Sequence, residues 1–242
     1  GLTLSNSGSA SISIAVGAAS GDHATIADPV VISNTAAFTK KPGTAWAVGT
    51  AQGCLDTGSA EGFSWYHVFL LTRLDRGVVD ALCPTSATWP TMPSNYTKKR
   101  RIGAVRTTWF GTAGAEIYPF SQVGDFFRWA TTTATLDVNS ATSGTSAVTA
   151  TLSVPNGVTV LALANAMAGN TSGCYLSELT ASDEAPSFGT APQGSLGTAG
   201  GNNTMGQVQV MTDTASSIRY RCSQNSDIRI NTMGWFDRRG AQ

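Results

Sequence analysis

The spacing of the apolar residues constrains this sequence most, because it repeats every two residues through most of the 242-residue chain. In "SASISIAVGAAS", Ile12, Ile14 and Val16 alternate with small or polar residues, whereas "FSWYHVFLLTR" is apolar on both faces. A period of two is typical of β-strands, and an apolar run with no polar face is typical of a central strand. Only "VLALANAMAGN" is also compatible with a helix, and its β-branched approach from a turn favours a strand. The spacing therefore predicts an all-β protein.

Turn signals interrupt the apolar runs at several points. We predict a buried hairpin from Phe63 to Cys83 that reverses at "LDRG". A second hairpin is predicted in "SAVTATLSVPNGVTVLALANAMA", where Pro155-Asn156-Gly157 supplies the turn chemistry. Many short strands separated by turns favour a β-sandwich or a jelly roll.

The chain is long enough for two domains. The Thr- and Ser-rich stretch from Ala130 to Thr145 separates an aromatic-rich half from a more polar half. We expect two β-sandwich or jelly-roll-like domains built from short antiparallel strands, residues 1–130 and 131–242. The second should carry a long exposed loop near residues 187–206, where turn-forming residues are densest.

Charge is scarce in this sequence. Fifteen Lys and Arg residues balance fifteen Asp and Glu residues, and charged residues make up 12% of the chain, against roughly 25% in an average soluble domain. Lys98, Lys99, Arg100 and Arg101 are the densest group of cations, but in a strand they alternate between two faces. We therefore expect a charged strand edge and no nucleic-acid partner. We expect no membrane insertion, because no stretch approaches the ~18–20 apolar residues that a membrane helix needs.

The four cysteines are widely separated. Cys54, Cys83, Cys174 and Cys222 form no CxxC or CxxH spacing, so we expect no zinc or other metal site. Their even number permits two disulfides. Because a chain of this size does not need disulfides, and Cys83 and Cys222 lie in strand-like runs, we expect buried free thiols.

The sequence lacks the motifs of common enzyme classes. His23 and His67 are the two histidines, no GxSxG motif is present, and His67 lies among large apolar residues, where a core position is expected. Asp183 and Glu184 are candidates for a glycosidase pair, but adjacent loop carboxylates usually diverge. Calcium and phosphate-loop motifs are also absent. We expect no catalytic residues and no cofactor.

Sugar binding requires exposed aromatic rings together with planar polar partners. Six tryptophans are present, and Trp89 lies in "SATWPTMPSNY", where two prolines and several hydroxyl residues predict a loop. A packing role for Trp89 remains the alternative, and Trp109, Trp129 and Trp235 lie in strand patterns that favour the core. The candidate ligand-binding residues are Trp89, Tyr96, Asn202 and Asn203.

Three blocks of the chain resemble a known module. "GLTLSN", "WYHVFLLTRLDRGVVDALCPTSATWPTMPSNYTKKRRIGAV" and "IRINTMGWFDRRG" are similar to the C-terminal module of fibre-type proteins of tailed bacteriophages and prophages. The resemblance implies a structural protein on the virion surface, a fibre or spike that assembles as a homotrimer, contacts other virion proteins and binds a host-surface polysaccharide. It implies no catalytic residue, and it makes the basic quartet a scaffold feature that pairs with carboxylates of a neighbouring subunit.

Two alternatives remain open at this point. The chain could be an architectural head, collar or tail decoration protein without a receptor, or a polysaccharide depolymerase. The start at Gly1, without a methionine, leads us to expect a processed chain or part of a longer one.

Overall fold

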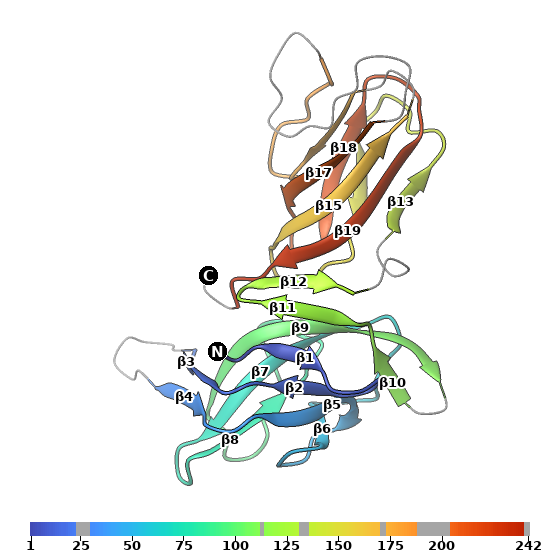
Figure 1. Ribbon diagram of the computed structural model, residues 1–242. Coiled ribbons are helices and arrows are strands. Elements are labelled where there is room, and N and C mark those ends of the chain that lie inside the picture. The colour runs from blue at the N-terminus through green and yellow to red at the C-terminus, as the bar shows by residue number, and fades with distance from the viewer. Residues whose placement is uncertain (23–29, 112–113, 131–135, 170–172, 188–203, 240–242) are drawn as a thin grey trace. The chain divides into compact units, whose positions relative to one another are not determined.

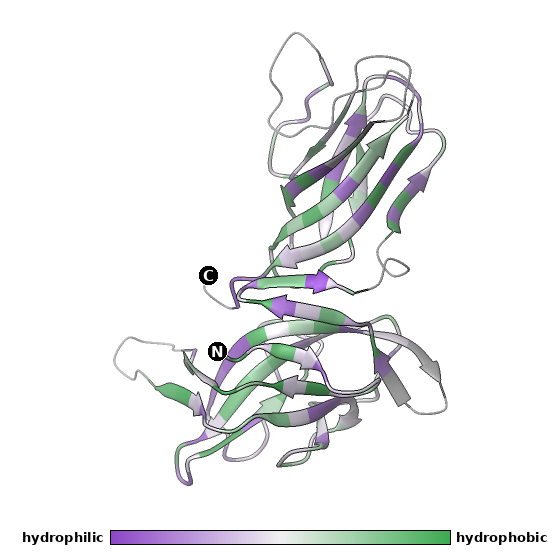
Figure 2. Ribbon diagram, in the orientation of Figure 1, coloured by the Kyte–Doolittle hydropathy of each residue, from purple (hydrophilic) through white to green (hydrophobic). Residues whose placement is uncertain are grey.

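The computed structural model describes residues 1–242 except 23–29, 112–113, 131–135, 170–172, 188–203 and 240–242 (Figure 1). No helix occurs in the described residues, which confirms the all-β prediction. Consequently no helix there is long and apolar enough to cross a bilayer. Figure 2 shows how hydrophobic and hydrophilic residues alternate along many of the strands.

The chain divides into two compact units, Gly1–Asp125 with Arg238–Gln242, and Phe126–Asp237. The sequence predicts a boundary after residue 130 and two continuous domains. The structure differs in the second respect, because the last residues of the chain belong to the first unit. The second unit is thus an insertion near the end of the first.

The first unit contains eleven strands in its described residues. They are β1 (Leu4–Asn6), β2 (Ile12–Ile14), β3 (Gly17–Ser20), β4 (Val31–Asn34), β5 (Phe38–Ala45), β6 (Gln52–Leu55), β7 (Trp65–Arg73), β8 (Val78–Leu82), β9 (Lys98–Gly111), β10 (Gly114–Ile117) and β11 (Phe120–Val123). Two four-stranded sheets have the orders β1-β2-β5-β6 and β10-β9-β7-β8, and β3 pairs with β4. All these pairs are antiparallel except β5 with β6.

The strand β7 forms the centre of the first unit. Its residues from Tyr66 to Thr72 are buried on both faces, as the apolar run "WYHVFLL" predicts. The strand pairs with β8 through a turn at "LDRG", so the predicted hairpin from Phe63 to Cys83 is confirmed. On its other side β7 pairs with β9 from Trp65 to Thr72.

The second unit is built from two antiparallel sheets. Its strands are β12 (Phe126–Trp129), β13 (Leu136–Ser140), β14 (Val148–Thr151), β15 (Leu161–Ala168), β16 (Cys174–Ser177), β17 (Thr204–Met211), β18 (Ser217–Cys222) and β19 (Ile228–Phe236). One sheet has the order β12-β19-β15-β17, with β13 also on β19, and the other has the order β14-β18-β16. The strand β17 begins at Thr204, so part of the predicted loop 187–206 is a strand, and most of that loop lies outside the described residues.

The second predicted hairpin is wrong. Residues Leu161–Ala168 do form a strand, as expected, but β14 pairs with β18, while β15 pairs with β17 and β19. Pro155-Asn156-Gly157 therefore turns the chain from one sheet to the other, and Gly157 has the positive φ of 78° that such a turn requires.

The alternation along β15 places its small residues inward. Ala162, Ala164, Ala166 and Ala168 are buried, and they lie opposite buried Val210, Val208, Ile230 and Ile228 of the flanking strands. Leu161, Leu163 and Met167 are on the other face and are only partly covered. The larger apolar side chains of this strand thus face away from the interior of the unit, the reverse of the usual arrangement.

Aromatic residues fill the base of the second unit. The ring of Trp235 is 1% exposed and stacks on Phe127 with the ring centroids 5.2 Å apart. Trp129 packs at the same distance from Trp235, and its indole N–H donates to the carbonyl of Ser153. Trp129 and Trp235 are therefore core residues, as predicted, while the side chain of Trp109 lies outside the described residues.

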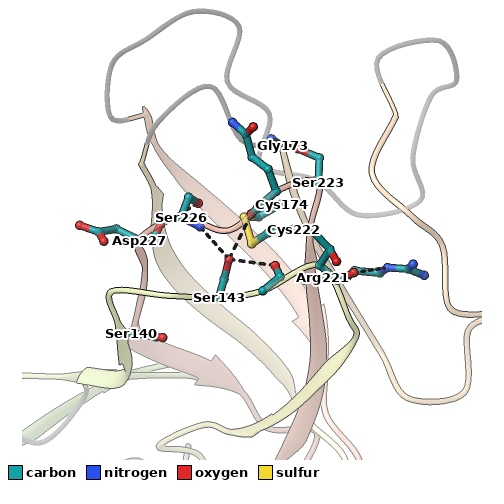
Figure 3. The surroundings of a disulfide bond; sticks show 12 residues. Ser140, Ser143, Gly173, Cys174, Arg221, Cys222, Ser223, Ser226 and Asp227 are labelled. Atoms are coloured by element: carbon teal, nitrogen blue, oxygen red, sulfur yellow. Dashed lines mark hydrogen bonds between the residues drawn. A yellow bond between two sulfur atoms is a disulfide. The ribbon is translucent and has the colours of Figure 1, made fainter.

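Both possible disulfides are present, so the expectation of free thiols is wrong. Cys54 is bonded to Cys83 in the first unit, and Cys174 to Cys222 in the second. Figure 3 shows the second bond, whose cysteines are directly opposite each other on β16 and β18. Nearby, the hydroxyl of Ser143 accepts a hydrogen bond from the Ser226 N–H. The sequence does not predict this pairing, because the two cysteines of each bond lie 29 and 48 residues apart.

Candidate functional site

The candidate site is the loop between β8 and β9, residues 84–97, which carries Trp89. The indole of Trp89 is 86% exposed, the highest value among the exposed large apolar residues. The alternative role in packing is therefore excluded. An exposed indole presents a flat apolar ring to solvent, and such a ring can stack on the apolar face of a sugar.

The loop is held tightly at its two ends. At the start, Cys83 is bonded to Cys54, and the carbonyl of Pro84 accepts from the backbone N–H of His67 on β7. At the end, the N–H of Thr97 donates to the carbonyl of Thr72. These contacts tie the loop to the central strand of the unit, so its ends do not move independently of the core.

The backbone around Trp89 is also fixed. The hydroxyl of Ser86 accepts from the Trp89 N–H at 3.0 Å, which forms a local turn. One carboxylate oxygen of Asp56 accepts from the Thr91 N–H at 3.0 Å, and the other from the Thr57 N–H. Pro90 and Pro93 restrict φ on the same stretch. The indole is therefore displayed on a preorganised backbone, which lowers the entropy cost of binding.

Tyr96 does not belong to the exposed surface. Its side chain is 5% exposed and packs with Phe69, Leu71 and Leu82, and its ring meets Trp46 edge to face at 5.4 Å. The prediction that Tyr96 binds ligand is wrong, because the ring anchors the loop from below. Burial raises the pKa of the Tyr96 hydroxyl.

A buried ion pair supports this anchor. Lys40 and Asp80 are 0% and 1% exposed, and their charged atoms are 2.9 Å apart. Lys40 also donates to the carbonyls of Ala47 and Gly49, and Asp80 accepts from the Gly49 N–H. The pair thereby fixes the segment that carries Trp46 beneath Tyr96. Burial lowers the pKa of Lys40, and the bond to Asp80 opposes that shift.

The surface around Trp89 offers neutral hydrogen-bonding groups. Exposed neighbours in the loop are hydroxyl and amide residues: Thr85, Thr88, Thr91, Ser94 and Asn95. The carboxylate of Asp56, which is hydrogen-bonded to this loop, already accepts hydrogen bonds from two backbone N–H groups. This arrangement suits a hydroxyl-rich, uncharged part of a ligand. Asn202 and Asn203, the other candidate binding residues, lie outside the described residues.

The basic quartet of β9 is occupied by internal contacts. Lys99 forms an ion pair with Asp22 at 3.1 Å, and Arg100 donates to the carbonyl of Arg239 at 3.1 Å. Arg101 is 4% exposed, and its Nε donates to Nδ1 of His67, which must be unprotonated to accept. His67 is 0% exposed, so its predicted core position is confirmed. The carboxylate partner Asp22 belongs to this same chain.

The candidate carboxylates Asp183 and Glu184 both line a small pocket in the second unit, together with Arg219 and Arg221. Asp183 forms an ion pair with Arg221 at 2.9 Å. Among the described residues, no group of three or more His, Cys, Asp or Glu side chains could hold a metal ion. His23 lies outside that part of the chain.

Comparisons with known proteins give no further evidence on the function of this site. No family model matches the chain, and no curated protein or solved structure shows significant similarity to it.

Proposed function

We propose that this chain is a fibre or spike module of a bacteriophage virion that attaches to a host-surface glycan through Trp89. The observation that carries the proposal is the 86% exposed indole on a loop fixed by a disulfide, two prolines and a buried aromatic anchor. Leaving a large apolar ring in water is unfavourable, and an exposed aromatic on a rigid frame is typical of a binding surface.

The two disulfides support a location on the outside of a particle. Disulfides persist in oxidising surroundings, which include virion surfaces, and are rare in proteins that work in the cytosol. The low content of charged residues, 12%, also fits a surface that must avoid non-specific adsorption to charged envelopes.

The outer face of β15, β17 and β19 supports assembly with other copies. This outer face presents Leu161, Leu163, Met167, Met205, Met211, Met233 and Phe236, together with Asn165, Gln207, Gln209 and Asn231. Arg229 is the one charged residue among these outward positions. The carboxylate of Asp227 offsets its charge, and the side-chain oxygen of Asn139 accepts a hydrogen bond from it. A neutral apolar face meets a second copy without charge repulsion, which fits the proposed homotrimer.

The same outer face is the observation that favours the second candidate, an architectural virion protein. Contacts with another virion protein would cover it equally well, and such a role would not require Trp89.

The test is a cell-binding assay with the purified chain and its Trp89→Ala variant. Because Trp89 is exposed, the variant should keep its thermal midpoint while binding to glycan-bearing host cells falls by roughly 5- to 150-fold, as for the loss of one aromatic stacking contact worth about 1–3 kcal/mol. Leu74→Ala is the matched control, since Leu74 is an exposed apolar residue of the β7–β8 turn, 55% exposed. Cells stripped of surface polysaccharide should bind neither protein. Equal binding by the wild type and Trp89→Ala would refute the adhesin proposal and leave the architectural role.

A further inference from the structure

Four arginines meet at a cavity of about 240 Å³ in the first unit. Arg100 and Arg101 come from β9, and Arg238 and Arg239 from the end of the chain. Asp125 is the one carboxylate of the lining, and small or apolar residues complete it. We call this cavity the arginine pocket. It is separate from the Trp89 loop, which contributes no residue to it.

The arginine pocket is strongly positive within a chain that is neutral overall. Four arginines and one aspartate give a formal charge of 4 − 1 = +3 for the lining. Asp22, whose carboxylate is 3.6 Å from Arg100, reduces the local sum to +2. Arginines do not lose their charge at any pH at which the protein is folded. The electrostatic interaction with the lining therefore stabilises an anionic group in the pocket.

Internal contacts hold three of the arginines in place. Arg239 binds Asp125 at 2.7 Å and donates to the carbonyl of Gly1, while its own carbonyl accepts from Arg100. Arg101 is buried, and its Nε donates to His67. Arg238 is exposed at the same cavity and adds a fourth guanidinium, with five N–H donors. Because the other three side chains are already ordered, a ligand that binds beside Arg238 would lose little entropy in fixing them.

We propose that the arginine pocket binds the carboxylate of an acidic sugar, such as a hexuronic acid residue of a surface polysaccharide. A carboxylate matches the planar fork of a guanidinium in a two-bond contact. The cavity corresponds to about eight waters at roughly 30 Å³ each, which is more space than a single inorganic anion fills and enough for one sugar ring. The inference rests on the proposed function only in naming a polysaccharide as the source of the sugar.

Arg238 provides the test, because it is exposed at the rim and its removal breaks none of the ion pairs that order the pocket. Glucuronate is titrated into the whole chain and followed by calorimetry or ligand-observed NMR. Glucuronate should bind, glucose should not, and Arg238→Gln should weaken glucuronate binding by about tenfold, the loss of one charge-assisted contact. Arg76→Gln is the matched control, since Arg76 is an exposed arginine of the β7–β8 turn.

Three results would overturn the inference: no binding of glucuronate, equal binding by Arg238→Gln, or binding of inorganic phosphate as tight as that of glucuronate, which would mark a general anion site. The Trp89→Ala variant separates this inference from the proposed function. Glucuronate binding that survives Trp89→Ala, in a protein that does not bind cells, would support the pocket and refute the adhesin. Cell binding without any glucuronate binding would do the opposite.

Discussion

Two aromatic residues of one loop show that burial decides which role a side chain can have. Trp89 and Tyr96 lie in the same short loop, yet one is 86% exposed and the other is 5% exposed. The sequence context of proline, serine and threonine predicts the loop and the exposure of Trp89. It could not predict the position of Tyr96, because the pocket that buries it comes from Trp46, Phe69, Leu71 and Leu82, which belong to other parts of the chain.

Asp137 is the residue whose ionisation should be visible in stability. It accepts from the hydroxyl of Ser153 and from the N–H and hydroxyl of Thr232, and burial raises its pKa above the ordinary value of 3.8. A folded state with a raised carboxyl pKa holds its proton more tightly than the unfolded chain does. The stability gained in acid is therefore lost as the pH rises from about 4 through the raised pKa.

Asp137→Asn should remove this loss. The amide oxygen can accept from Thr232 and the amide nitrogen can donate to the Ser153 hydroxyl, so the contacts persist without a charge. We expect the variant to show a flatter dependence of urea stability on pH above about 4, and to be no less stable than the wild type near neutral pH. Parallel curves for the two proteins would show that Asp137 does not titrate differently on folding.

At the level of strands, local patterns predicted some elements well. The run "WYHVFLL" predicted β7, and its hairpin with β8 followed from a short turn between two apolar runs. The sequence predicts the turn at Pro155-Asn156-Gly157 but not the pairing of the strands on either side of it. Turn residues indicate that the chain reverses, and they do not indicate which strand it then pairs with. The disulfides were missed for the same reason, with partners 29 and 48 residues apart.

The bond between Cys54 and Cys83 should matter to binding as well as to stability. By the chain-entropy relation, a closed loop of 29 residues stabilises the fold by roughly 3.5 kcal/mol, and one of 48 residues by roughly 4 kcal/mol. We expect the double variant Cys54→Ser, Cys83→Ser to lower the thermal midpoint and to weaken glycan binding, because the start of the Trp89 loop loses its anchor.

The second disulfide supplies the control for this prediction. Cys174→Ser with Cys222→Ser should lower stability by a comparable amount but leave the binding of the first unit unchanged. Calorimetry and the cell-binding assay measure both effects. The anchoring role would be contradicted if the two double variants changed binding equally.

For the molecule as a whole, the outer face of β15, β17 and β19 is the feature that sequence periodicity alone could not interpret. The alternation in "LALANAMA" identifies two faces but does not say which is inside, since alanine, leucine and methionine are all apolar. Only the neighbouring strands show that the alanines are buried and that Leu163 faces outward.

Leu163→Glu tests whether copies of the chain cover this face. A charge placed at the centre of a neutral interface should convert the oligomer to a monomer in light scattering, while the thermal midpoint of a partly exposed site falls only slightly. Leu74→Glu, on an exposed turn, should leave the mass unchanged. A wild type that is already monomeric, or a Leu163→Glu protein of unchanged mass, would rule out self-association through this face.

The contacts of Arg239 have a consequence for how the protein is made. Arg239 reaches back to Gly1, 238 residues earlier, and also binds Asp125 and Arg100. A ribosome releases the start of the first unit long before it adds this arginine, so the second unit is synthesised while the first still lacks its last contacts. The contacts of Arg239 with Arg100 and Asp125 therefore form only after the second unit has been synthesised, and they complete the cavity that we propose as a binding site.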